Sequence, residues 1–366
     1  MKSVEVLVVG GGPAGLVAAL NLAPLRSVVV VERLAEAPDR IGESLAPAAR
    51  RLFADMGLLE RFEAEGHARR HAHRVIWGND RAVDVDLIRD LDGAGWTIER
   101  ARFENWLRGV ATLRGAVIRA PAKVIRLERG AGAWRASIVV DGREVEFAAD
   151  FLIDATGRGA SFARMFGARR RVADRLVCSW AHGVVEREVA AGTAFLQAAR
   201  EGWWYSAPLP RGRRVVAFHT DADLPQSRDA RTPQAMVEAA RRAGEIGALL
   251  DESGFRATRS GFTAANSSVL DAVAGEGWAA VGDAAIAFDP LSARGLFNAL
   301  FTGLAAAEAV DRLLAGDRDA FSGYAAVIAE VAAAYRRELA LWYAQEKRWA
   351  SHPFWRRRLV QETPAA

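Results

Sequence analysis

The sequence predicts an α/β fold with three parts: a Rossmann-like nucleotide-binding domain of the three-layer ββα type, an inserted and mainly antiparallel β-sheet, and a helical carboxyl-terminal region. Three observations lead to this prediction. Residues 4–32 read as strand, glycine turn, helix and strand. Residues 171–268 alternate like β-strands and are rich in aromatic side chains. The alanine-rich segments that follow residue 295 have the periodicity of helices.

Composition limits the class of protein. The chain has 366 residues, of which 51% are hydrophobic, so it can bury a substantial core in two domains or one nested domain. Cys178 is the only cysteine, which rules out an intramolecular disulfide. No charged-then-apolar leader and no long apolar run is present, so we expect a cytoplasmic protein without a transmembrane segment. The formal charge is +4 and the arginines are scattered, so we expect no nucleic-acid binding.

The amino-terminal strand ends in a glycine turn of the form G-x-G-x-x-G. In this pattern Gly10 permits the tight turn, Gly12 lets a pyrophosphate approach the backbone, and Gly15 allows the helix to pack closely on the strand. Pro13 and Ala14 begin the helix, where the missing N–H of proline costs nothing and the free amides favour phosphate. A plain strand-turn-helix unit is the alternative interpretation.

The residues after the second strand favour the dinucleotide interpretation. Val28–Val31 is an apolar strand that ends at Glu32, 17 positions after Gly15. A carboxylate about 20 residues beyond such a turn holds a ribose hydroxyl. We therefore expect Glu32 and the adjoining Arg33 to contact the cofactor.

Four further segments occur in order along the chain. Ile41–Leu45 reads Ile-Gly-Glu-Ser-Leu, Arg100–Leu107 fits R-x-x-F-D-x-x-L with Glu in place of Asp, Phe151–Arg158 ends a strand in Ala-Thr-Gly, and Val281–Leu300 opens with Gly-Asp. With the amino-terminal unit they resemble the FAD site of the FAD-dependent monooxygenase and tryptophan halogenase superfamily, which has the group A hydroxylase-like fold. The resemblance is closest to the flavoprotein monooxygenases of tryptophylquinone cofactor biogenesis.

This resemblance implies FAD as cofactor and a set of residues around it. The backbone amides that begin the helix after the Asp289–Gly295 loop would stabilise negative charge on reduced flavin. Ser44 has a simpler alternative role as the cap of a following helix. The implied contacts are Gly10, Gly12, Pro13, Ala14, Gly15, Glu32, Arg33, Glu43, Ser44, Arg100, Gly157, Asp283, Pro290, Gly295 and Leu296.

The same resemblance implies domain boundaries. Residues 1–73, 97–170 and 269–317 would form a discontinuous FAD-binding domain, residues 74–96 and 171–268 a substrate-binding β-sheet domain, and residues 318–366 the helical carboxyl-terminal region.

A tryptophan-rich strand is the candidate wall of a substrate pocket. Gly202–Pro210 contains Trp203, Trp204 and Tyr205, and strand alternation sends Trp203 and Tyr205 to one face and Trp204 to the other. At least one ring is thus able to face a cavity, and the alternative for each ring is a place in the core. The segment resembles the Gly-Trp-Trp-Tyr-Ser strand of the tryptophylquinone-related monooxygenases.

No catalytic base follows from the sequence, but Glu43, His182 and His219 are candidates. His67, His71 and His73 lie in a polar run without cysteine or carboxylate companions, so we expect no metal site.

The resemblance implies a flavin C4a-hydroperoxide that hydroxylates an aromatic, indole-like or tryptophan-like substrate, which could be a small molecule or a tryptophan side chain within a partner polypeptide. Only one G-x-G-x-x-G is present, so NADH or NADPH would act as a transient reductant or a separate flavin reductase would supply electrons. A halogenase would need a lysine to carry the activated halogen, and no lysine occurs between Lys2 and Lys123. The alternatives are a flavin-dependent halogenase, a geranylgeranyl-reductase-like FAD oxidoreductase, and a non-catalytic binding protein with the FAD fold.

Overall fold

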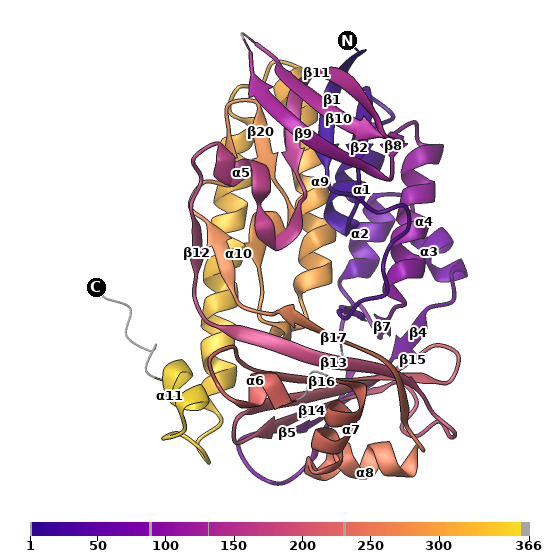
Figure 1. Ribbon diagram of the computed structural model, residues 1–366, viewed down its shortest axis with the longest axis vertical. Helices are drawn as coiled ribbons and strands as arrows, with labels where there is room; N and C mark the ends of the chain where they lie inside the picture. The colour runs from indigo at the N-terminus through magenta and orange to yellow at the C-terminus, as the bar shows by residue number, and fades with distance from the viewer. Residues whose placement is uncertain (1, 88–89, 131, 230–231, 360–366) are drawn as a thin grey trace.

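The chain builds two large sheets, and one long helix runs beside both of them (Figure 1). The computed structural model describes residues 2–87, 90–130, 132–229 and 232–359. In Figure 1 the amino-terminal sheet lies at the top and the second large sheet lies at the bottom. The FAD-related motifs belong to the upper part, and the tryptophan-rich strand belongs to the lower part.

The upper sheet has a parallel centre in the order β19-β20-β11-β1-β2-β8, of which only the β19–β20 pair is antiparallel, and an antiparallel hairpin of β9 and β10 extends from β11. Helix α1 packs against both α4 and α9 beside it. The bounds are β1 Lys2–Val9, β2 Val28–Val31, β8 Val117–Arg119, β9 Ala122–Arg129, β10 Trp134–Val140, β11 Arg143–Asp154, β19 Ala274–Gly275, β20 Trp278–Ala280, α1 Pro13–Leu22, α4 Arg100–Leu113 and α9 Gly295–Leu314.

The centre of this sheet is hydrophobic because it is covered on both faces. All four residues of β2 and the last four of β1 are buried, as expected for parallel strands under helices. The turn between β10 and β11 uses Asp141 and Gly142 at φ 50° and 74°, the two positive values that a tight type I′ hairpin requires.

The lower sheet has the order β17-β13-β16-β15-β14-β5-β6, antiparallel except for the β14–β5 pair. We call the face that carries Trp180 and His182 the inner face, and the face that carries Ala181 and Trp204 the outer face. The outer face packs against α7 and α8, which lie below the sheet in Figure 1. The bounds are β5 Ala72–Ile76, β6 Val83–Asp86, β13 Leu176–Val184, β14 Thr193–Ala199, β15 Gly202–Leu209, β16 Arg213–Asp221, β17 Arg256–Ala264, α6 Gln226–Asp229, α7 Pro233–Arg241 and α8 Gly244–Glu252.

Two small sheets and several short elements connect the large ones. The first small sheet has the order β3-β7-β4, and the second has the order β12-β18-β21. The bounds are β3 Ser44–Leu45, β4 Ala68–Arg70, β7 Gly95–Thr97, β12 Arg170–Val172, β18 Ser268–Leu270, β21 Ile286–Ala287, α2 Ala49–Asp55, α3 Leu59–Ala64 and α5 Ser161–Met165, with 3₁₀ turns at Gly157–Gly159, Gly282–Ala284 and Pro290–Ser292.

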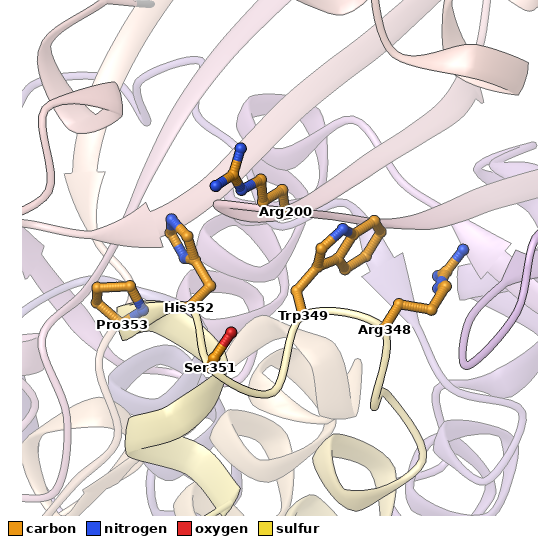
Figure 2. A pocket seen from close by; sticks show the side chains of 6 residues that line it. All are labelled: Arg200, Arg348, Trp349, Ser351, His352 and Pro353. Carbon is orange, nitrogen blue, oxygen red and sulfur yellow. The ribbon is translucent and has the colours of Figure 1, made fainter.

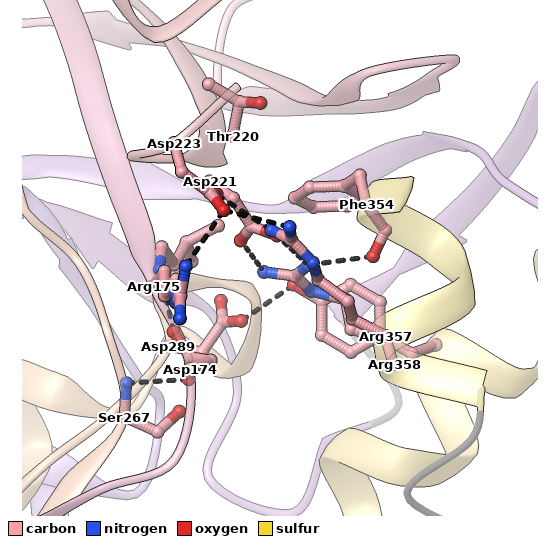
Figure 3. Close-up of polar contacts among 12 residues, drawn as sticks. Asp174, Arg175, Thr220, Asp221, Asp223, Ser267, Asp289, Phe354, Arg357 and Arg358 are labelled. Carbon is pink, nitrogen blue, oxygen red and sulfur yellow. Dashed lines mark hydrogen bonds and ion pairs between the residues drawn. The ribbon is translucent and has the colours of Figure 1, made fainter. Parts of the chain in front are cut away.

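The carboxyl-terminal helices fasten the two large sheets together. Helix α10 (Ala320–Ala344) lies along α9, and α11 (Pro353–Leu359) packs at the end of the lower sheet. Phe354 and Trp355 are fully buried, and the Trp355 indole N–H donates to the carbonyl of Ala199 at 3.0 Å. Figure 3 shows Arg357 and Arg358 reaching the buried Asp221 of β16, with the Arg358–Asp221 pair at 2.8 Å.

Some element boundaries differ from the periodicity of the sequence. Helical periodicity starts near Trp96, but α4 begins at Arg100, because residues 95–97 pair with two neighbouring strands as β7. The alanine-rich region after residue 295 forms two helices, separated at residues 315–319 by a turn that includes Gly316 at φ 106°. Part of the expected region 318–366, residues 360–366, lies outside the described residues.

Candidate active site

The glycine turn after β1 has the geometry of a phosphate cradle. A Cβ at Gly10 would lie 2.2 Å from the Ala155 carbonyl oxygen, and a Cβ at Gly15 would lie 2.1 Å from the Gly10 carbonyl oxygen. Gly12 differs, because among the described residues beyond its chain neighbours and its own helix backbone, only a nitrogen of Arg40 comes within 4 Å of its hypothetical Cβ, at 4.0 Å. Gly10 and Gly15 therefore serve packing, while Gly12 leaves space in front of the first turn of α1.

Glu32 lies beside this turn. One carboxylate oxygen accepts the Gly11 N–H at 2.6 Å and the other accepts the Leu34 N–H at 2.9 Å. Arg33 is exposed next to it. The carboxylate is thus fixed by backbone amides, and each oxygen keeps a further lone pair for a ribose hydroxyl.

The Gly157 and Asp283 segments meet on the other side of the turn. Gly157 has φ 70° and no atom within 4 Å of its hypothetical Cβ. Arg158 lies 3.4 Å from the half-buried Asp283 carboxylate and donates to the Phe288 carbonyl at 3.1 Å. Gly282 packs on Ala14, since a Cβ there would approach the Ala14 Cβ to 2.7 Å. The two motifs, far apart in sequence, therefore share one surface.

Two tyrosines of α10 hold the loop before α9 through hydrogen bonds. Asp289 is buried, its amide donates to the Tyr335 hydroxyl at 2.7 Å, and its carboxylate accepts the Tyr343 hydroxyl at 2.7 Å. Burial, with Asp174 nearby, raises the pKa of Asp289 to about 6. Pro290 is exposed, Leu296 is buried in the first turn of α9, and Gly295 has open space at its Cβ position.

Arg100 organises the segment that carries Glu43. Its guanidinium donates to the carbonyls of Ile41 at 3.3 Å and Gly42 at 3.2 Å, and it pairs with Glu104 at 2.6 Å. Glu104 also pairs with Arg40. The arginine of the expected motif therefore fixes the backbone of the Ile41–Gly42 segment.

These residues fit FAD. Open space at the Cβ positions of Gly12, Gly157 and Gly295 surrounds the glycine turn, the Arg158–Asp283 pair and the start of α9. Glu32 and Asp283 supply oxygens for hydroxyl groups, and the first turns of α1 and α9 supply free amides. Side chains at the three glycines would fill this space.

Two of the three candidate catalytic residues are in direct contact. His182 Nε2 lies 2.6 Å from Glu43 Oε1, and His182 Nδ1 lies 3.3 Å from Asp39 Oδ2. Both Glu43 and His182 are buried, and the Gly42 N–H donates to the second Glu43 oxygen at 2.9 Å. Burial alone would lower the pKa of His182, but the two carboxylates outweigh it and the pKa is raised above its usual value. This cluster of Asp39, Glu43 and His182 therefore favours a protonated imidazole.

The third candidate, His219, has a different environment. Its ring stacks on Trp203 with centroids 3.6 Å apart and planes at 7°, and burial lowers its pKa to about 3. Trp203 is fully buried and its indole N–H donates to the Tyr343 hydroxyl at 3.2 Å. His219 and Trp203 thus pack in the core between the sheet and α10, away from the cluster of Asp39, Glu43 and His182.

The three expected pocket residues divide between the faces. Trp204 lies on the outer face against α7 and α8, which corrects its expected place in a pocket: strand alternation turns it away from His182. Tyr205 lies on the inner face, half-buried, and burial raises its pKa to about 12. Ile41 and Leu291, from the two segments expected at the flavin, pack in the same apolar cluster as Tyr205 and Trp180.

Several functional contacts were missed from the sequence. Ser44 does not cap a helix, because α2 begins at Ala49 and the Ser44 hydroxyl accepts a hydrogen bond from the buried Arg70. Asp39 and Tyr343 had no motif to mark them. Only the folded chain brings Asp39 to His182.

His67, the lysines and the pocket beside α11 lie outside the cluster of Asp39, Glu43 and His182. His67 packs its ring among Phe62 and Phe103, and in the described ranges no group of three or more His, Cys, Asp or Glu side chains has the geometry to hold a metal ion. Lys2, Lys123 and Lys347 are exposed and lie on β1, on β9 and after α10. An open pocket of about 480 Å³ lies beside α11. Its lining includes Arg200 and Trp349 (Figure 2) and none of the candidate catalytic residues.

Comparison with known families decides between these interpretations of the turn. Residues 3–319 match the family model described as FAD binding domain. The chain belongs to this FAD-binding family. The expected superfamily, fold and class of FAD-dependent oxidoreductase are thereby confirmed. No helix in the described part of the chain is long and apolar enough to cross a membrane.

Individual relatives cover nearly the whole chain. It is 28% identical over 370 residues to the putative FAD-dependent oxidoreductase LodB of Marinomonas mediterranea, covering 98% of this chain and 97% of that protein. The fold is similar to that of the myxobacterial chondrochloren halogenase CndH, with a TM-score of 0.90, 22% identity, and coverage of 99% and 87%. It is also similar to that of the peptidyl tryptophan dihydroxylase QhpG, with a TM-score of 0.78, 23% identity, and coverage of 100% and 80%.

Proposed function

We propose that this FAD-binding chain is a monooxygenase that hydroxylates an indole ring, carried as a tryptophan side chain by a partner polypeptide. One atom of O₂ replaces a ring hydrogen as a hydroxyl group, and the other leaves as water. NADH or NADPH, acting directly or through a separate flavin reductase, supplies the two electrons. Bound FAD supplies the chemistry that transfers these electrons to oxygen.

The observation that carries the proposal is the buried pair of Glu43 and His182 on the inner face of the lower sheet. It lies beside Trp180, whose ring centroid is 4.8 Å from that of His182, and near Tyr205. An aromatic substrate on this face would meet aromatic walls and a buried carboxylate. Ile41 and Leu291 pack in the same apolar cluster and exclude water from it.

Glu43 is the proposed proton acceptor. The ring carbon that gains oxygen must lose its proton, and a carboxylate held by His182 and the Gly42 amide is fixed to receive it. His182 acts through Glu43 as a positioning residue, because its nitrogens both point to carboxylates.

Halogenation is the second candidate, supported by the similarity of fold to the halogenase CndH. It would need an amine near the substrate. The three lysines lie on β1, on β9 and after α10, and all are exposed. Their positions favour oxygenation.

The test is product analysis with the complete protein reconstituted with FAD, a flavin reductase, NADH, air, and both chloride and bromide. A tryptophan-containing peptide and free indoles are the substrates, and products are identified by mass spectrometry. We expect hydroxylated tryptophan. Glu43→Gln should lower its rate of formation by about 100-fold or more while bound FAD keeps its visible spectrum, and the exposed Glu36→Gln should not. Halogenated products, or full activity of Glu43→Gln, would contradict the proposal.

A further inference from the structure

Strand β17 forms an open edge of the lower sheet next to the cluster of Asp39, Glu43 and His182. It pairs with β13 on one side, and no strand in the described ranges pairs with its other side. None of its nine residues, Arg256–Ala264, is buried. Natural sheets usually blunt such edges with prolines, inward charges or very short strands. This edge has no proline and is nine residues long; it carries Arg256 and Arg259, and its small side chains at Ser260 and Gly261 leave the backbone there accessible.

The direction of its backbone groups follows from two hydrogen bonds. The Ala265 N–H donates to the Leu176 carbonyl, and on the other side of β13 the Ala222 N–H donates to the Arg175 carbonyl. Because hydrogen-bonded and non-hydrogen-bonded pairs alternate in an antiparallel ladder, odd-numbered residues from 259 to 265 bond to β13. The N–H and C=O groups of Ser260 and Ala264 therefore point to the free edge.

On the inner face at this edge, the Trp180 indole occupies the space that a side chain at position 261 would fill. Gly261 lies directly across from Trp180, and a Cβ at Gly261 would lie 2.4 Å from the indole ring. The indole thus lies over the glycine and reaches toward the edge. A side chain on an added strand, opposite Gly261 and on the same face, would stand about 5 Å away across the ladder. It would meet the Trp180 ring without an intervening side chain.

The charge of the edge favours an acidic occupant. Arg256 and Arg259 are exposed, and among the described residues neither guanidinium has an ion pair. Arg259 is the direct neighbour of His182 on β13. The other end of β17 leads through Ser267, whose hydroxyl bonds to Tyr335, to the Asp289 loop expected at the flavin.

We infer that the polypeptide substrate binds as an added strand along the free edge of β17, with acidic residues near Arg256 and Arg259 and the reacting tryptophan opposite Gly261 against Trp180. This inference rests on the proposed function for the identity of the reacting side chain. The binding mode is β-augmentation, in which backbone hydrogen bonds supply affinity and alternate side chains supply specificity.

The test measures binding without turnover, with oxidised FAD enzyme and no reductant. A library of nine-residue peptides with a central tryptophan and random flanks is selected on the full-length protein. We expect enriched peptides to carry acidic and β-branched residues, and the affinity of the best of them to fall about tenfold or more in Ser260→Pro, which removes one outward N–H. Ser260→Ala, which keeps that N–H, should bind like the unmodified protein.

A second measurement guards against a misfolded variant. N-methylation of the peptide amide that pairs with the edge should weaken binding to the unmodified protein by a similar factor, whereas methylation of an amide on the opposite side should not. Failure to enrich any tryptophan peptide would overturn the inference. It would also be overturned if Ser260→Pro bound the peptide as tightly as the unmodified protein does and if methylation of the edge-pairing amide did not weaken binding. If tryptophan is oxidised but Ser260→Pro leaves the peptide affinity unchanged, only the binding mode is contradicted. If the peptide binds at the edge but is not oxidised, only the proposed function is contradicted.

Discussion

The sequence identifies Glu43 and His182 as separate candidate residues, but it does not show that they are in contact. Both were candidates because Glu43 follows a motif glycine and His182 lies on a strand of the expected substrate domain. Their contact at 2.6 Å joins residues 139 positions apart, so it depends on how the lower sheet docks on the nucleotide-binding part. Asp39 completes the cluster from a turn that no motif marks.

The raised pKa of His182 predicts a pH-dependent stability. The protonated imidazole is stabilised in the folded state, so this contribution is fully present below the unfolded pKa of about 6.5 and is lost as the pH rises through the higher folded pKa. The thermal midpoint of the protein relative to that of His182→Gln should therefore fall as the pH is raised from 6 to 9. The exposed His71→Gln is the control. A difference between protein and variant that is constant over this range would disprove the charge pairing.

The glycine turn predicts two different outcomes for two similar changes. Gly12→Ala places a methyl group in open space, so the free protein should keep its stability while its affinity for FAD falls about tenfold or more. Gly15→Ala drives a Cβ against the Gly10 carbonyl and should lower the free energy of unfolding by about 1–3 kcal/mol. Chemical unfolding of the FAD-free protein and a fluorescence titration with FAD separate the two. Unchanged FAD affinity in Gly12→Ala would contradict the assigned cradle.

For helices, strands and turns, the local sequence determines the type of element, and pairing with distant segments determines where the element begins and ends. The Asp141-Gly142 turn was predictable because few residue pairs accept two positive φ angles. The start of α4 was not, because Trp96 and Thr97 have partners in β3 and β4 that lie far away in the sequence. Ser44 belongs to one of these pairings, which is why its apparent role as a cap was wrong.

Helix α11 predicts a strong effect from one buried ring. Trp355 is fully buried, packs edge-on against Trp77 at 5.3 Å, and donates a hydrogen bond to β14. Trp355→Ala should lower the free energy of unfolding by about 3–5 kcal/mol. The adjacent exposed Arg356→Ala should change it by about 0.5 kcal/mol or less. Urea unfolding followed by circular dichroism measures both, and similar small effects would mean that α11 does not clamp the sheet.

At the scale of the whole molecule, ordered motifs predicted the family and fold better than any local pattern predicted the site. The glycine turn and the Gly282-Asp283 turn meet through Ala14, and sequence resemblance alone had placed them together. The docking of the lower sheet, the inward turn of Tyr205 and the outward turn of Trp204 depend on strand register across seven strands. Register is set by the packed core, which short motifs do not encode.

The central claim is that this chain uses FAD to place one oxygen atom on an indole ring. The most direct measurement supplies isotopically heavy oxygen gas to the FAD-reconstituted protein with NADH, a flavin reductase, bromide and a tryptophan-containing peptide, and reads the peptide by tandem mass spectrometry. We expect the tryptophan ring to gain heavy oxygen and no bromine. A brominated tryptophan, or oxygen that carries the isotope composition of the water, would contradict it.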